Sequence, residues 1–366
     1  MAVFRFRSYI LTVGNYRENI LATLAYYDVF DFPLKEEEVF RFLVNLKRHP
    51  MSERPRIPDF DEIRTELEGL RNENAVNFYD GFYYLFGRNH LVPLRLRREK
   101  MAKKKWRKTC RAVWWLKFLP YIRAVFASGS LAMNNADELG DLDILIVVKR
   151  GRIWLSRLLI SGLMSLIGMR RKYNQKIAPD KICLNHYITD KSLLIPYKSI
   201  YAAQTYINLK SVFISEPGII AEFYRTNSWL GDYVLNFEAE KLASEKIGLA
   251  ARHNFLTKTE SKAGELILNT KLGNWLDNRA RRWQINRIEK HRKQDPPGGR
   301  VVYNDEQLEF HPGSVETEVI EQYNQRLKKL GLDELAIEKD SGLPPHPERI
   351  NFFQCQNFSV TLEGLS

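Results

Sequence analysis

The feature that most constrains this chain is a small-residue turn followed by a strand that begins with two aspartates. The sequence Phe-Ala-Ser-Gly-Ser ends at Ser130, and after a short gap Asp141 and Asp143 open a long apolar run. Alternate residues of a strand project to the same face of a sheet. We therefore expect the two aspartate side chains to lie side by side, with Leu142 and Ile144 pointing into the core.

The residue types of this segment suggest a site for a metal ion and a nucleotide. Two neighbouring carboxylates repel each other unless a cation lies between them. Hard divalent cations such as Mg²⁺ (or Mn²⁺) bind carboxylates together with substrate phosphates. The turn at Gly129 and Ser130 offers backbone N–H groups and a hydroxyl to phosphates. The alternative is a buried glycine turn followed by a strand with two surface aspartates.

At these residues the chain resembles the DNA polymerase beta-like nucleotidyltransferase superfamily. Its signature is an apolar residue, Gly, then Gly or Ser, a gap of roughly a dozen residues, and Asp, apolar, Asp or Glu, apolar. Gly129, Ser130, Asp141 and Asp143 match it in order and spacing. The resemblance implies that the two aspartates bind Mg²⁺ and that Gly129 and Ser130 hold the phosphates of a nucleoside triphosphate (NTP).

The family pattern also places a third carboxylate on a later strand, as general base or extra metal ligand. The strand expected at 181–188 offers Asn185 at this position, and an amide cannot take a proton from an attacking hydroxyl. Asp180, Asp190 and His186 are the nearest substitutes in sequence. If Cys183, Asn185 and Tyr187 share one strand face, Asn185 points toward the aspartate pair.

Composition favours an anionic partner and a reducing compartment. The chain of 366 residues has a formal net charge of +12, which suits a nucleic acid, a nucleotide or a membrane surface. Three cysteines that are far apart in sequence indicate reduced thiols, and we expect a cytoplasmic protein. The most apolar helix candidate, 153–169, is shorter than the roughly 20 residues of a membrane span, so we expect it to be packed inside the protein.

The N-terminal segment is expected to form a winged helix-turn-helix. Helices are expected at 16–30, 34–46 and 62–72, followed by a hairpin at Asp80-Gly81. The third helix carries Glu62, Glu66 and Glu68, whereas a DNA-reading helix is normally basic. A protein-contact or scaffold role is therefore favoured over sequence-specific reading of duplex DNA.

Two later segments are strongly basic. Residues 95–123 contain twelve Lys or Arg against one acid, Glu99, and residues 271–293 are also rich in Lys and Arg with interspersed Trp. Such helices are either solvated surfaces whose aromatics pack on the next domain or clamps for phosphates. We expect both segments to be candidate binding surfaces for RNA or another polyanion, with 271–293 closing over the nucleotide.

The expected fold class is α+β: a winged-helix-like domain at 1–90, a basic linker helix at 91–119, and a nucleotidyltransferase-type mixed sheet with helices at 120–195. A mainly helical domain at 196–335 and an extended tail at 336–366 follow. Helices are expected before the Gly-Ser turn and at 201–212, 221–224 with 229–237, 260–293 and 314–330; loops or extended segments are expected at 50–58, 296–299 and 341–347.

Two functions follow from these observations. The first is transfer of a nucleoside monophosphate from an NTP to an acceptor, such as RNA or a protein side chain, with release of pyrophosphate. The second is a catalytically degenerate nucleotidyltransferase-type protein that binds nucleotide or RNA as a regulatory module, with a protein partner bound by the winged helix. Asn185 favours the second function.

Overall fold

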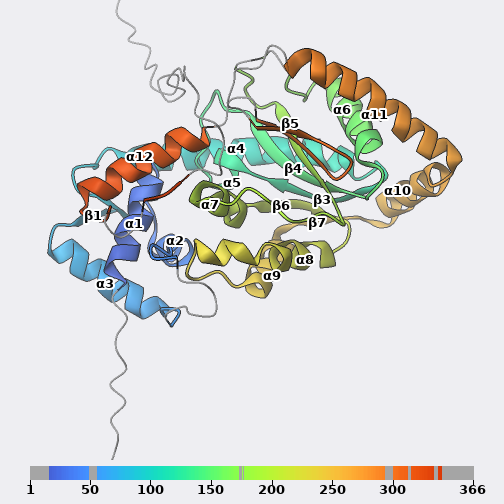
Figure 1. Cartoon of the computed structure of the whole chain (residues 1–366). Coiled ribbons are helices and arrows are strands. Elements are labelled where there is room, and N and C mark those ends of the chain that lie inside the picture. Colours follow the sequence, from blue (N-terminus) through green and yellow to red (C-terminus); the bar gives the residue numbers. More distant parts are fainter. Residues whose placement is uncertain are drawn as a thin grey trace, which may run out of the picture.

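The computed structural model is an α+β protein built on a seven-stranded mixed sheet with helices on both faces (Figure 1). It describes residues 16–48, 56–172, 175, 177–292, 300–311, 315–333 and 337–339. The loops or extended segments expected at 296–299 and 341–347, and most of 50–58, fall outside the described residues. Within the described part of the chain, no helix combines the length and the apolar character that crossing a membrane requires.

The sheet is ordered β7-β6-β3-β4-β5-β9-β8. Strands β4 and β5 are parallel, as are β6 and β7, and the other neighbours are antiparallel. The strands are β3 (Ile122–Ala127), β4 (Leu142–Val148), β5 (Ile182–Thr189), β6 (Lys210–Ile214), β7 (Ala251–Arg252), β8 (Arg300–Tyr303) and β9 (Gln307–His311).

The central strands are apolar because both faces of the sheet are covered. Every residue of β3 is buried, as is β4 from Ile144 onward. A continuous apolar run is expected for a strand in this position. The segment before the Gly-Ser turn is therefore strand β3, and the helix expected there was wrong: a short apolar run bounded by turns fits either state.

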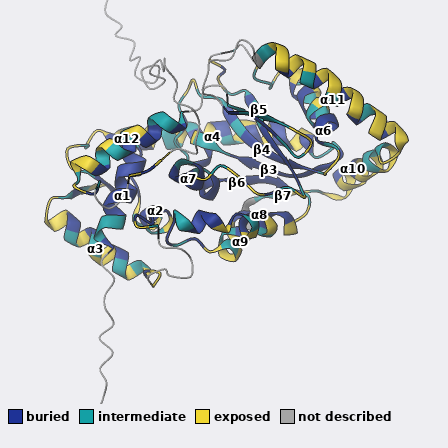
Figure 2. Cartoon of the chain, viewed as in Figure 1, coloured by how far each residue is buried: buried dark blue, intermediate teal, exposed yellow. Residues whose placement is uncertain are grey.

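Two hydrophobic cores lie on opposite faces of the sheet. On one face, the helices α1 (Arg17–Asp28), α7 (Ile200–Asn208), α8 (Gly218–Thr226) and α12 (Glu316–Lys329) pack around Phe126, Leu145 and Ile188. On the other, α4 (Leu91–Leu116), α6 (Ile153–Leu166) and α11 (Lys271–Arg292) pack around Val125, Ile146 and Tyr187. Figure 2 shows the strands dark blue between these layers, with exposed residues concentrated on the outer helices.

The N-terminal segment contains helices α1, α2 (Glu36–Arg41) and α3 (Phe60–Asn72), followed by the hairpin of β1 (Val76–Tyr79) and β2 (Phe82–Leu85). Asp80 and Gly81 form its turn with positive φ angles of 50° and 82°, as a two-residue hairpin turn requires. Helix α2 ends at Arg41, earlier than expected, and Val44 instead forms a β-bridge with Val234. These helices share one core with α7, α8 and α12.

The C-terminal half differs most from expectation because it adds strands to the sheet. The helix expected at 201–212 ends at Asn208, and Val212, Phe213 and Ile214 continue as buried strand β6 beside β3. Residues 221–224 lie in helix α8, whereas 229–237 contain only a 3₁₀ turn at Ser228–Asp232, and helix α9 (Ala239–Leu249) follows. Strands β8 and β9 form a hairpin on the far side of β5.

The single helix expected at 260–293 is two helices, α10 (Phe255–Leu268) and α11. The chain turns so tightly between them that a Cβ on Gly273 would lie 1.6 Å from the carbonyl oxygen of Leu268. Only glycine fits this approach of two backbones. The expected helix at 314–330 is α12.

Candidate functional site

The Gly-Ser turn and the aspartate pair meet where strands β3 and β4 lie side by side. The backbone N–H of Ser128 donates to the carbonyl oxygen of Asp143 at 3.0 Å, and the short helix α5 (Gly129–Ala132) begins there. Gly129 has φ +60°, and a Cβ at this position would lie 2.9 Å from Oδ2 of Asp143. The backbone of the turn is therefore pressed against the aspartate side chain, which only glycine permits without a shift.

The two aspartates lie together, as their spacing predicted. One carboxylate oxygen of Asp141, one of Asp143 and Sγ of Cys183 all lie within 4.8 Å of one another. Leu142 and Ile144 are fully buried. Burial and the neighbouring charge of Asp141 raise the pKa of Asp143 to about 7. A cation bound between the two carboxylates would favour the ionised form of both.

One cation already contacts this pair. The guanidinium of Arg171 forms an ion pair with Asp141, and its Nη1 lies 3.7 Å from Sγ of Cys183. Burial and the two aspartates raise the pKa of the Cys183 thiol well above its usual value, so Cys183 is a neutral thiol. The hard ligands of the cluster are then the two carboxylates, a donor set that suits Mg²⁺ or Mn²⁺.

Asn185 points at the aspartate pair, as predicted. Strand β5 runs parallel to β4, and Nδ2 of Asn185 donates to Oδ1 of Asp143 at 3.2 Å. The predicted alternation is wrong beyond this residue. Strand β5 holds an extra residue between the pairs Asp143–Cys183 and Leu145–His186. This bulge returns His186 to the face of Asp143, and Tyr187 packs on the opposite face.

The alternative bases named from the sequence make their contacts elsewhere. Asp180 pairs with Lys105 and Lys108; hydrogen bonds from these lysines outweigh the opposing effect of burial and lower its pKa. Asp190 accepts from the backbone N–H of Arg150 at the opposite end of β5. The ring of His186 lies beside the rings of Tyr206 and His311.

A buried lysine that sequence patterns did not single out fixes the loop before Asp141. Lys105 of helix α4 is 1% exposed, and its Nζ donates to the carbonyl oxygen of Gly140 at 2.6 Å while pairing with Asp180. Gly140 also donates its N–H to Asp137 at 2.6 Å. In the sequence Lys105 was one of twelve cations in a basic run, so nothing there distinguished it.

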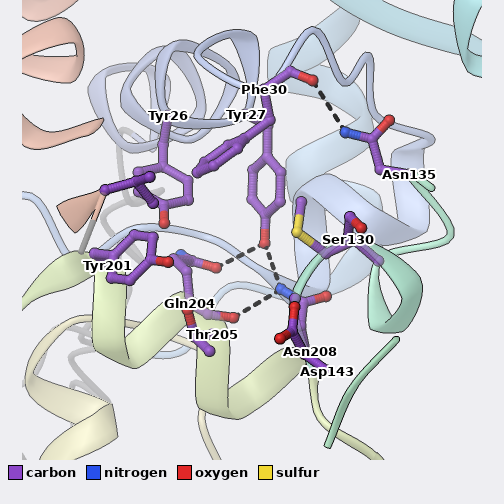
Figure 3. Close-up of a pocket in the computed structure, with 13 residues that line it drawn as sticks. Tyr26, Tyr27, Phe30, Ser130, Asn135, Asp143, Tyr201, Gln204, Thr205 and Asn208 are labelled. Carbon is purple, nitrogen blue, oxygen red and sulfur yellow. Dashed lines mark hydrogen bonds between the residues drawn. The ribbon is translucent and has the colours of Figure 1, made fainter. Parts of the chain in front are cut away.

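A cavity of about 270 Å³ opens beside Ser130 and Asp143 (Figure 3). Its opposite wall comes from α1 and α7. The hydroxyl of Tyr27 donates to Gln204 at 2.7 Å and accepts from Asn208 at 2.9 Å. The lining residues are Tyr26, Tyr27, Phe30, Gly129, Ser130, Met133, Asn135, Asp143, Tyr201, Gln204, Thr205, Asn208 and Val315. Sequence analysis missed the tyrosine and amide residues because they are far from the motif in sequence, and only the fold brings them to it.

The basic segments are partly structural. Arg95 is buried and pairs with Glu38 and Glu99, and Arg123 pairs with Glu265. Seven other cations of helix α4 lie on its exposed side; they are Arg97, Lys100, Lys103, Lys104, Arg107, Lys108 and Arg111. Helix α4 adjoins the cavity, because Arg98 donates to Asn135 at 3.2 Å.

Helix α11 does not close over the cavity as expected. It packs on α6, on the sheet face opposite α1 and α7 (Figure 1). Its exposed side carries Trp275 and Trp283, which are 56% and 53% exposed, with Arg279 and Arg282 between them.

Comparison with known proteins adds no family to these observations: no protein-family model, no curated protein and no solved structure matches the chain.

Proposed function

We propose that this chain is a cytoplasmic, Mg²⁺-dependent nucleotidyltransferase that moves a nucleoside monophosphate from an NTP to an acceptor. The observation that carries the proposal is the meeting of Asp141 and Asp143 beside Gly129 and Ser130 at the edge of a cavity. The resemblance to the DNA polymerase beta-like superfamily gave the same four residues from sequence. The proximity of these residues is the arrangement that the resemblance implies, and it is the support for this proposal.

In this proposal each side chain has a distinct task. Asp141 and Asp143 hold the metal ion, which neutralises negative charge on the phosphates during in-line transfer. The hydroxyl of Ser130 and the adjacent backbone N–H groups hold the outer phosphates. The cavity between α1 and α7 receives the nucleoside, with the ring of Tyr201 as an aromatic wall.

The site offers Asn185 where the family has a general base. A hydroxyl acceptor must lose a proton, and loss of a base typically costs about 10²–10⁴ in rate. A phosphate acceptor is already ionised and needs no such base. Helix α4 contacts Asn135 at the cavity through Arg98, and its outer side carries the exposed cations, so a polyanionic acceptor such as RNA would approach along this helix.

The proposal is tested by incubating the protein with each α-³²P-labelled NTP, Mg²⁺ and an RNA or lysate pool. Transfer should label an acceptor and release pyrophosphate, and both should be lost in Asp143→Ala. If only one of the NTPs gives labelling that is lost in Asp143→Ala, that NTP is the nucleotide donor. Labelling that persists in Asp143→Ala would contradict the site assignment.

A second candidate is a regulatory module that binds nucleotide or RNA without transfer. Two contacts favour it: Asn185 stands where a carboxylate is expected, and Arg171 pairs with Asp141 where a metal ion would bind. The N-terminal helices and hairpin would then recruit a protein partner. Mg²⁺-independent nucleotide binding with no pyrophosphate release would support this function over the first.

A further inference from the structure

A second cluster of metal-ligating side chains lies on the neighbouring strand pair, β5 and β9. His186 of β5 is directly opposite Glu309 of β9, and His311 follows two residues later on the same face of β9. One nitrogen of each histidine and one oxygen of Glu309 lie within 4.8 Å of one another. This group shares no residue with the aspartate pair.

One side of this group is buried and the other is open. A neutral imidazole offers a metal ion the lone pair of its unprotonated ring nitrogen. His186 and Glu309 are 6% and 1% exposed, whereas the His311 side chain is 35% exposed and leaves a path for entry.

The surroundings hold the carboxylate in place without exhausting its lone pairs. Nε of Arg300 donates to Oε1 of Glu309 at 2.6 Å, and Nε2 of Gln307 donates to Oε2 at 3.0 Å. Each carboxylate oxygen has two lone pairs, so one remains on each for a metal ion. Ligating carboxylates are commonly oriented by such outer hydrogen bonds.

Arg300 also joins the group to a second buried carboxylate. It lies 2.6 Å from Glu309 and 3.7 Å from Glu316.

We propose that His186, Glu309 and His311 bind a divalent transition-metal ion of the zinc type, with a fourth position open toward solvent. Imidazole nitrogen selects zinc over magnesium, so this site would take a different ion from the aspartate pair. Ligand atoms around a tetrahedral zinc lie roughly 3.4 Å apart. His311 Nε2 and Glu309 Oε1 are already 3.6 Å apart.

Such an ion would join β9 to the bulged part of β5. His186 follows Asn185, which contacts Asp143 of the candidate site. The metal site would thus hold the segment that positions Asn185, but its existence does not depend on the proposed transferase activity.

The test is to strip the full-length protein with chelator, remove the chelator, and titrate it with Zn²⁺ and separately with Co²⁺. With excess Mg²⁺ present to fill the aspartate pair, we expect one Zn²⁺ or Co²⁺ ion per chain and a Co²⁺ absorption spectrum of nitrogen and oxygen ligands without the charge-transfer band of a thiolate. His311→Ala should weaken Zn²⁺ binding at least tenfold, whereas His90→Ala, on the surface, and Cys183→Ser should bind as the wild type does.

Circular dichroism of His311→Ala checks that the fold is intact, and its partly exposed position makes it a safer variant than Glu309→Gln. Absence of stoichiometric Zn²⁺ binding by the wild type would overturn the proposal. Unchanged Zn²⁺ binding by folded His311→Ala would also overturn it, because the ion would then be bound at another site. A thiolate band that disappears in Cys183→Ser would overturn it too, because it would place the ion at Cys183.

Discussion

Replacing Gly129 by alanine should damage both stability and metal binding, because this glycine has two separate structural constraints. Its φ of +60° lies in the left-handed region, which costs a residue with a Cβ about 1–2 kcal/mol. Its added Cβ would also lie 2.9 Å from Oδ2 of Asp143, a contact that must be relieved by a shift. We expect the two effects together to lower the free energy of unfolding by about 2–4 kcal/mol.

Alanine substitutions at two other glycines distinguish the backbone cost of a positive φ from the cost of the close contact with Asp143. Gly331 has φ +69°, and an added Cβ there would meet nothing within 4 Å, so Gly331→Ala should show the backbone cost alone. Gly162 lies within helix α6 with open space around it, so Gly162→Ala should stabilise the protein by about 0.5–1 kcal/mol.

Urea unfolding measures the stabilities of these variants, and calorimetric titration with Mg²⁺ and a non-hydrolysable NTP measures binding. Only Gly129→Ala should weaken binding, because only its Cβ displaces Asp143. The reasoning would be refuted if Gly129→Ala were no less stable than Gly331→Ala and bound Mg²⁺-NTP as the wild type does.

Three further predictions concern the site and its surroundings. Asp143→Asn should abolish Mg²⁺-dependent transfer in the labelled-NTP assay while the circular dichroism spectrum is retained; full activity would exclude a metal-binding role. Asn185→Asp supplies the missing carboxylate and should raise NTP turnover on a hydroxyl acceptor, by up to about 10²-fold; no turnover in either form, with nucleotide still bound, would favour the regulatory function. Burial lowers the pKa of Lys246 to about 7, and its Nζ donates to the carbonyl oxygen of Ile207. Because the unfolded chain keeps this proton up to about pH 10.4, stability should rise between about pH 7 and 10, by at most about 1.4 kcal/mol per unit. Lys246→Met should lose this rise in urea unfolding measured across that range, and an unchanged slope would contradict the assignment.

The core of the candidate site could be predicted because it is local in sequence. Asp141 and Asp143 are two residues apart on one strand, and strand geometry alone places their side chains together. The same argument, applied to the next strand, predicted that the side chain of Asn185 points toward the aspartate pair. The argument failed at Tyr187, because an extra residue in β5 reverses the alternation and no sequence pattern marked that bulge.

The other residues of the candidate site could not be predicted, because contacts between segments that are far apart in the sequence bring them there. Lys105 reaches Gly140, and Tyr27 reaches Gln204, only once helices far apart in the chain are packed on the sheet. Strand β6 was missed for a related reason: Val212 and Phe213 continue an apolar pattern that a helix could equally have used, and pairing with β3 decides the outcome.

The shared core of the two ends of the described chain has a consequence for synthesis on the ribosome. Tyr26 of α1 packs edge-to-face on Tyr323 of α12, and Val315 lines the cavity together with Tyr26. A nascent chain emerges from its N-terminus and folds segment by segment. Helix α1 can pack on α3 and β2 early, but its contact with α12 must wait until the whole sheet has been synthesised, so the cavity proposed to bind the nucleoside is among the last features to be completed. Truncated products would carry the aspartate motif without a closed cavity beside it.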